Sequence, residues 1–208
     1  MAGFPVDPAL AKVLIHSKTL HCTAEVISII SMLSVETVFF SPHDKREAAN
    51  EAKAKFINLE GDHLTLLNVM RGYQAVHGDK EWCIQNFING RAIKNAMDIH
   101  NQLASFCEQA GIPPTSTAGN EVEPILRCFL HGFFTNVATR QMDGSYQTMV
   151  GKQVCHVHPS SVLFQKKASL VMFHEHVQTS RQYMRNVSAV AMPWLQSSGS
   201  HYFGFSST

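Results

Sequence analysis

The apolar residues of this 208-residue chain repeat at helical spacing as far as about residue 134, and beyond that point they follow the spacing of short strands. The helical period predicts helices over 8–16, from 23 onward, and over 45–56, 62–77, 91–110 and 122–134. Strand patterns cover 137–139, 146–148, 154–158, 170–177 and 183–190. The pair Asp143-Gly144 lies between the first two strands and is a typical hairpin turn. This order predicts an α+β fold, a helical bundle followed by a small closed sheet.

One obvious linker separates the two patterns. Residues 113–120 read Pro-Pro-Thr-Ser-Thr-Ala-Gly-Asn, a run of chain breakers and small polar residues. The chain is long enough for one large domain or two small ones. The linker therefore predicts a division between a helical part and a strand-rich part.

The charge balance gives no global sign of nucleic-acid binding. The net charge is +1 and only 16% of the residues are charged, so any contact with nucleic acid must come from a local patch. The most apolar stretch, 26–40, is interrupted by serines and a glutamate and is too short and polar to span a bilayer. The first residues lack the features of a secretory signal. The sequence predicts a soluble intracellular protein with no membrane partner.

The cysteines and histidines do not form a recognisable metal site. Five cysteines are scattered along the chain without a Cys-x-x-Cys pair, which is typical of reduced thiols in a core. The densest cluster is Cys155-His156-Val157-His158, but neighbouring residues of a strand face opposite sides of the sheet. We therefore expect no bound metal and no catalytic residue in this chain.

Two segments about ninety residues apart stand out. The first runs from Gly61 to Val69, and the second from His158 to Phe164. Locally, Asp62 is predicted to cap a helix whose apolar residues recur at helical spacing. The second segment is predicted to be a buried strand running into a Pro-Ser turn.

These two segments belong to a longer ordered set of motifs. The set consists of Met1-Ala2-x-Phe4-Pro5-x-Asp7-Pro8, Cys22-Thr23-x-Glu25, Ser31-Met32-Leu33-Ser34-Val35, Gly61-Asp62-His63-Leu64-Thr65-Leu66-Leu67-Asn68, Trp82-Cys83-x-x-Asn86-Phe87, Gly132-Phe133-Phe134, His158-Pro159-Ser160-Ser161, Tyr183-Met184-Arg185 and Trp194-Leu195. In this order the motifs cover almost the whole chain. The set closely resembles the C-terminal auxiliary region of DEAH-box RNA helicases.

The resemblance implies a domain plan. Residues 1–20 would be a remnant of the winged-helix segment, 21–118 the helical ratchet domain, and 119–208 an oligonucleotide-binding (OB) fold. Because the remnant has lost the rest of its domain, its apolar face is expected to lack a partner, and we expect this end to be frayed or prone to aggregate.

The resemblance also implies a function and partners. The auxiliary region would form one wall of a channel for single-stranded RNA and hold the RNA mainly by its backbone. Its other partners would be the RecA-like motor domains of the same helicase and activator proteins carrying a glycine-rich patch. The expected processes are pre-mRNA splicing or ribosome biogenesis, which predicts a nuclear protein, with the cytoplasm as the alternative.

The motor motifs of the family do not occur in this chain. There is no Gly-x-x-x-x-Gly-Lys-Ser/Thr phosphate loop and no Asp-Glu-Ala-His string. ATP and Mg²⁺ are therefore expected only in the motor domains, and this chain alone is expected neither to bind ATP in the family manner nor to unwind RNA. The alternative hypothesis is an adaptor or regulatory module that binds a protein partner without any motor.

Seven residues are candidates for RNA contact. Lys166 and Lys167 form a local basic patch or a solvated loop, and Arg185 faces the RNA or braces an acidic neighbour. The hydroxyls of Ser160 and Ser161 contact phosphates or cap the turn after the proline. On the predicted ratchet helix only Arg91 and Lys94 supply positive charge where the family usually has several arginines, which weakens the expected phosphate contact there.

Overall fold

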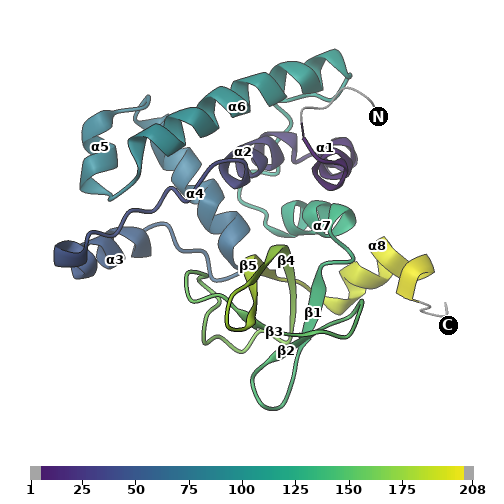
Figure 1. The fold of residues 1–208 in the computed structure, drawn as a ribbon. Helices are drawn as coiled ribbons and strands as arrows, with labels where there is room; N and C mark the ends of the chain where they lie inside the picture. Colours follow the sequence, from purple (N-terminus) through teal and green to yellow (C-terminus); the bar gives the residue numbers. More distant parts are fainter. Residues whose placement is uncertain (1–5, 204–208) are drawn as a thin grey trace.

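The computed structural model describes residues 6–203, with side chains to residue 198. A helical bundle lies on one side of a small barrel (Figure 1). The helices are α1 (Pro8–Leu20), α2 (Thr23–Leu33), the short 3₁₀ helix η1 (His43–Lys45), α3 (Arg46–Ala54), α4 (Asp62–Ala75), α5 (Lys80–Gln85), α6 (Gly90–Gln109), α7 (Glu123–Gly132) and α8 (Met192–Phe203). The strands are β1 (Val137–Arg140), β2 (Tyr146–Thr148), β3 (Val154–Val157), β4 (Leu170–Gln178) and β5 (Gln182–Ala189). The α+β prediction is confirmed.

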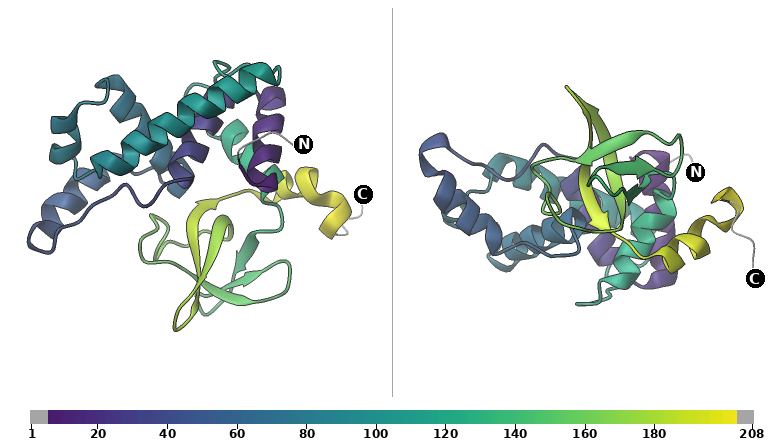
Figure 2. Two further views of the ribbon diagram at one scale, coloured as in Figure 1. Left: turned by 45° about the horizontal axis from the view of Figure 1, so that its top comes forward. Right: turned by 90° about the horizontal axis from the view of Figure 1, so that it is seen from below.

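Helix α2 is the centre of the bundle. Its residues Val26, Ile27, Ile29 and Ile30 are all buried, and so are its serines and Glu25, so the helix is covered by neighbours all round. It packs against α1, α4, α6 and α7. The long helix α6 crosses the top of the bundle (Figure 1), and the left view of Figure 2 places the barrel on the opposite side.

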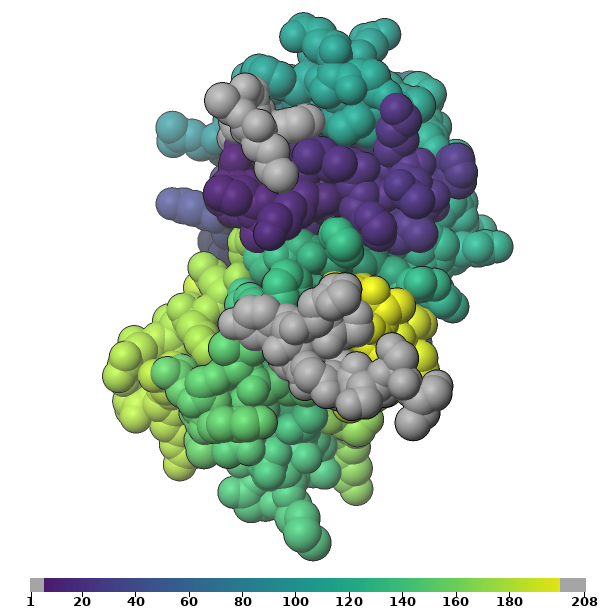
Figure 3. All heavy atoms as spheres, turned by 90° about the vertical axis from the view of Figure 1, so that its right-hand side faces the viewer, coloured from purple at the N-terminus to yellow at the C-terminus, as the bar shows by residue number. Residues whose placement is uncertain are grey.

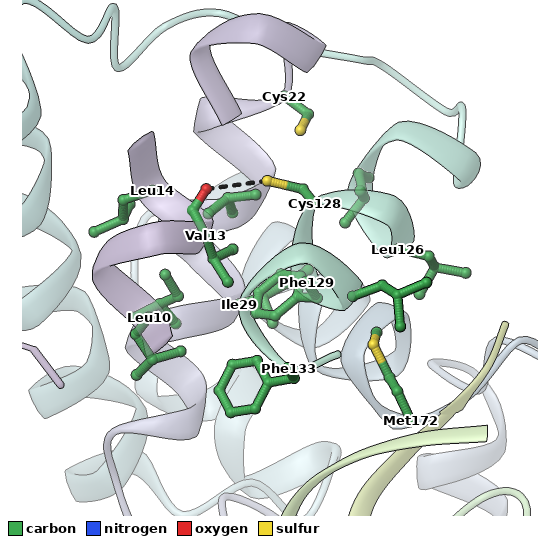
Figure 4. Packing of buried hydrophobic residues seen from close by; sticks show 14 of the residues in the cluster. Leu10, Val13, Leu14, Cys22, Ile29, Leu126, Cys128, Phe129, Phe133 and Met172 are labelled. Atoms are coloured by element: carbon green, nitrogen blue, oxygen red, sulfur yellow. Dashed lines mark hydrogen bonds between the residues drawn. The ribbon is translucent and has the colours of Figure 1, made fainter. Parts of the chain in front are cut away.

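The expectation of an unpartnered N-terminal helix is wrong. Leu10, Val13 and Leu14 of α1 are buried, and α1 packs along α7. The thiol of Cys128 on α7 donates to the carbonyl oxygen of Val13 at 3.0 Å (Figure 4). The apolar face of α1 therefore finds its partner in a helix more than a hundred residues further along the chain, which no local pattern shows.

The α1–α7 contact leads to a prediction about amide exchange. A Cβ on Gly132 would lie 2.5 Å from the carbonyl oxygen of Ala9, so the two helices touch backbone to backbone. We expect the amides of residues 10–15 to exchange with solvent as slowly as those of α7. Hydrogen exchange measured by mass spectrometry or NMR tests this, and exchange at the rate of an unfolded peptide in 10–15 alone would show that α1 frays.

The five strands close into a barrel in the order β1-β2-β3-β5-β4. All neighbouring pairs are antiparallel except β3 and β5, which are parallel. The predicted hairpin turn joins β1 to β2, and Asp143 accepts a hydrogen bond from the backbone N–H of Ser145 at 3.0 Å. A small Greek-key barrel of five strands is the architecture of OB folds.

Helix α7 joins the bundle to the barrel. Phe129 and Leu130 lie in one core cluster with α1 residues and with Leu170 and Met172 of the barrel. In the space-filling view α7 occupies the level between α1 and the barrel (Figure 3). The bundle and the barrel therefore share one hydrophobic core.

The predicted linker is held in place by a buried acid. The carboxylate of Glu25 on α2 accepts hydrogen bonds from the hydroxyl of Thr117 and the N–H of Ala118. Arg71 of α4 pairs with Glu25 at 3.2 Å and donates to the carbonyl oxygen of Gly119 at 2.7 Å. Because Glu25 is 3% exposed, these groups satisfy an otherwise unpaired buried charge. The segment is a fixed loop, and the domain boundaries at 20/21 and 118/119 stay a prediction.

The remaining expectations concern the cysteines, membrane-spanning helices and metal-binding groups. All five cysteines are unpaired and buried, as predicted. None of the helices within residues 6–203 has the length and apolar character that a membrane span requires. In the same part of the chain no three histidine, cysteine or acidic side chains gather as a metal-binding group.

Candidate nucleic-acid interface between the helices and the barrel

Asp62 connects the helical bundle to the barrel. It is the first residue of α4, and the cap position is taken by Gly61 without a side-chain hydrogen bond. One carboxylate oxygen of Asp62 accepts from the N–H of Val162 at 2.9 Å, and the other accepts from the N–H of Val187 at 2.8 Å. The prediction that Asp62 caps its own helix is therefore wrong. The two segments that stand out in the sequence meet here.

Gly61 allows this close approach. Its backbone has a φ of 135°, and it forms a β-bridge with Ser188 of β5. A Cβ at this position would lie 2.5 Å from the Cα of Ser188 and from the carbonyl oxygen of Val187. Beside it, the N–H of Ala189 donates to the carbonyl oxygen of Glu60 at 2.8 Å. Only glycine combines this φ with this contact.

His63 completes the junction. Its Nδ1 lies 2.7 Å from the hydroxyl oxygen of Ser188, and its ring centroid lies 5.0 Å from that of Phe129. Burial, with a smaller contribution from the nearby His174, lowers the pKa of His63 to about 3. The imidazole is therefore neutral at physiological pH.

Burial raises the pKa of Asp62 above its ordinary value, and hydrogen bonds from the hydroxyl of Ser161 and the N–H groups of Val162 and Val187 oppose that shift. The positive charge of Lys53 acts in the same opposing direction. The carboxylate is thus held by four groups that all favour its charged form, against the penalty of desolvation.

A crevice of about 500 Å³ opens beside this junction. Its walls come from the end of α2 and the segment that follows it (residues 32–39), from α3 and α4, from the turn after β3, and from β4 and β5. Lys53 of α3 crosses it, with Nζ donating to the carbonyl oxygen of Ser160 at 3.2 Å and lying 4.8 Å from the ring centroid of Phe39. Burial lowers the pKa of Lys53, and the charge of Asp62 acts against that shift.

The barrel side of the crevice carries Arg185. Its guanidinium lies 3.9 Å from the carboxylate of Glu175, directly opposite on β4. Because the ion pair is long and both side chains are partly exposed, it contributes little to stability. The guanidinium of Arg185 is therefore available to bind another anion. Next to it, Asn186 has a φ of 53° inside the strand, an irregularity that leaves His174 and Asn186 lining the crevice.

The structure brings only part of the predicted RNA-contact set together. Ser160 and Arg185 line the crevice. Ser161 is buried and its hydroxyl accepts from the N–H of Leu163 at 3.2 Å, which is the turn-capping role rather than a phosphate contact. Lys166 and Lys167 are exposed on the loop between β3 and β4, outside the crevice lining.

Arg91 and Lys94 lie elsewhere. They are exposed in the first turns of α6 and line a separate hollow beside α4 and α5. Their contact with RNA is not supported by proximity to the crevice and stays a prediction.

The sequence reasoning missed Lys53, His174 and Asn186. Lys53 lies in a run of helix-favouring residues and reaches a carbonyl 107 residues away. No local pattern marks such a contact. Only the residue type gives a weak indication of the positive φ of Asn186, since asparagine tolerates this conformation better than most residues.

Comparison with known proteins shows to which family this chain belongs. A family model described as a ratchet-like helicase-associated domain matches residues 7–66, and a model described as an oligonucleotide/oligosaccharide-binding fold matches residues 125–202. The ATP-dependent RNA helicase DHX33 of Homo sapiens is 38% identical over 203 residues, which cover 98% of this chain and 29% of the relative. The chain belongs to the C-terminal regions of the DEAH-box RNA helicases.

Two further relatives agree. The pre-mRNA-splicing factor ATP-dependent RNA helicase prp22 of Schizosaccharomyces pombe is 41% identical over 206 residues, which cover 99% of this chain and 18% of the relative. The pre-mRNA-splicing factor ATP-dependent RNA helicase DEAH10 of Arabidopsis thaliana is 36% identical over 217 residues, which cover 98% of this chain and 30% of the relative. This DEAH-box C-terminal region thus spans less than a third of the length of these relatives. The family resemblance seen in the motifs is confirmed.

Proposed function

We propose that this chain forms one wall of the RNA channel of a DEAH-box helicase and holds single-stranded RNA by its backbone in the crevice between bundle and barrel. The observation that carries the proposal is the meeting of Lys53, Ser160 and Arg185 from three distant segments at one polar crevice. Cationic side chains and hydroxyls are the usual partners of phosphate oxygens.

The charge of the crevice sets the expected strength. Its two cations, Lys53 and Arg185, share the crevice with the carboxylates of Glu36, Asp62 and Glu175, so the wall has no excess of positive charge and binding by this region alone should be weak. Motor domains of the RecA type, with their ATP and Mg²⁺, would supply hydrolysis and the opposite wall. We further propose a nuclear role in pre-mRNA splicing or ribosome biogenesis and docking of activator proteins with a glycine-rich patch, in line with the names of the splicing relatives.

Salt-dependent RNA binding tests the proposal. Titration of the purified chain with fluorescently labelled oligouridine should show affinity that falls as salt rises. Two phosphate contacts predict a slope of log K against log salt of about −1.4, or about fivefold weaker binding at about 150 mM than at about 50 mM. Replacing Lys53 and Arg185 together with glutamine should make the slope shallower by about 1.4. Lys166→Gln with Lys167→Gln tests the loop in the same way.

The matched control is Lys12→Gln with Lys18→Gln, which removes two exposed cations of α1 outside the crevice. This variant should keep the slope of the original chain. Absence of binding at low salt, or binding that does not change with salt, would contradict the RNA-wall proposal and favour the adaptor alternative.

A further inference from the structure

A second and larger hollow lies at the other end of the bundle. It has a volume of about 1060 Å³ and is formed by α4, the turn at 76–80, α5 and the first half of α6. In Figure 1 these elements lie at the upper left, away from α8. Its floor is apolar, with Tyr73, Cys83, Ile88 and Met97. None of its lining residues belongs to the crevice.

The rim carries an exposed isoleucine. Ile84 of α5 is 69% exposed, while its neighbour Cys83 is buried. A large apolar side chain on this edge continues the apolar floor outward to the surface. Burying such a side chain against a partner removes apolar surface from water and so stabilises a complex.

The rest of the rim is positively charged. Lys80, Arg91 and Lys94 are exposed and line the hollow, and the one carboxylate among the lining residues is that of Asp98. Within residues 6–198, no ion pair involves any of these three cations. Because the whole chain carries a net charge of only +1, this rim is a local concentration of unpaired positive charge.

We propose that this hollow docks a short segment of a protein partner that inserts an apolar side chain over Ile84 and Ile88 and presents carboxylates to Lys80, Arg91 and Lys94. The charge complementarity names the chemistry of the partner: apolar and acidic. A volume above the usual range for small ligands suits a peptide segment.

The floor argues against RNA as the occupant. Base stacking by single-stranded RNA would need an exposed aromatic face on this floor. Tyr73 is 8% exposed, and its ring packs beside that of Trp82, with centroids 6.2 Å apart. The aromatic surface of Tyr73 and Trp82 is therefore used inside the bundle, and the rest of the floor is formed by Cys83, Ile88 and Met97.

Peptide display tests the docking proposal independently of RNA binding. The probe is a library of random twelve-residue peptides selected on the immobilised chain. We expect the enriched peptides to combine aspartate or glutamate with leucine, isoleucine or phenylalanine. Ile84→Ser, and separately Arg91→Gln with Lys94→Gln, should each weaken binding of an enriched peptide by tenfold or more, which is about 1.4 kcal/mol at that boundary.

Lys12→Gln with Lys18→Gln again serves as the control and should bind the peptide like the original chain. The thermal unfolding of each variant shows whether it is folded, and the substituted side chains are all exposed. The proposal is overturned by a failure to enrich any peptide, by enriched peptides without acidic residues, or by binding that the groove variants leave unchanged. It is also overturned if the Arg91 and Lys94 variant loses oligouridine binding while peptide binding persists.

Discussion

Replacing Asp62 with alanine should lower the free energy of unfolding by about 3–5 kcal/mol. Asp62 is 8% exposed, and its carboxylate accepts hydrogen bonds from the backbone N–H groups of Val162 and Val187. Its removal leaves both N–H groups buried without an acceptor, at about 1–3 kcal/mol each. It also removes the only side chain that spans from α4 to both the turn after β3 and strand β5 in the described part of the chain. Urea denaturation at neutral pH measures the loss.

Two comparisons make the Asp62 prediction specific. Asp62→Asn has a single carbonyl oxygen and faces one N–H with its own amide, so it should be destabilised by about half as much. Asp44→Ala removes an exposed carboxylate of η1 and should change the free energy by less than about 0.5 kcal/mol. Equal stability of the Asp62→Ala variant and the original chain would show that the junction contributes nothing.

Acidification from pH 7 to pH 5 should destabilise the chain by about 2 kcal/mol through His63 alone. The pKa of His63 is about 3 in the folded chain, against about 6.5 when unfolded. A lowered folded pKa means that the unfolded state takes up the proton first. The stabilisation is therefore present above pH 6.5 and is lost as the pH falls from 6.5 toward 3, at about 1.4 kcal/mol per pH unit.

The His63 effect is isolated by comparing variants. His63→Gln should be less stable at pH 7 than the original chain, but its unfolding free energy should change by about 2 kcal/mol less between pH 7 and pH 5. His43→Gln, an exposed histidine of η1, should keep the full pH dependence. The raised pKa of Asp62 acts in the opposite direction, with stability lost as pH rises, and it cancels in the comparison because Asp62 is present in every variant. Identical pH dependence in the His63→Gln variant would contradict the assignment.

Most elements of this fold follow from local signals, although the helices α5 and α8 were not predicted. The Asp143-Gly144 turn, the period of two after residue 137 and the apolar face of 91–110 each predict an element within a few residues of its observed bounds. The pairing of α1 with α7 does not follow from such signals, because an apolar face records that a partner exists but not which one.

The candidate site was predictable only in part. Arg185 and Ser160 were found because they lie in the family motifs, and both line the crevice. Lys53 was missed, and Arg91 and Lys94 were assigned to a surface that is separate from the crevice. The sequence gives the chemistry of each side chain, whereas the residues that surround it depend on how the bundle and the barrel pack together.

The sequence by itself determined the class of fold, the order of the elements and the family, because hydrophobic period, turn residues and motif order act over short stretches of chain. Only the tertiary structure decided the role of Gly61-Asp62-His63. The partners of Asp62 lie 100 and 125 residues away, and a buried carboxylate must satisfy its oxygens with whatever donors the packing brings to it. What looked like a helix cap is the joint between the bundle and the barrel.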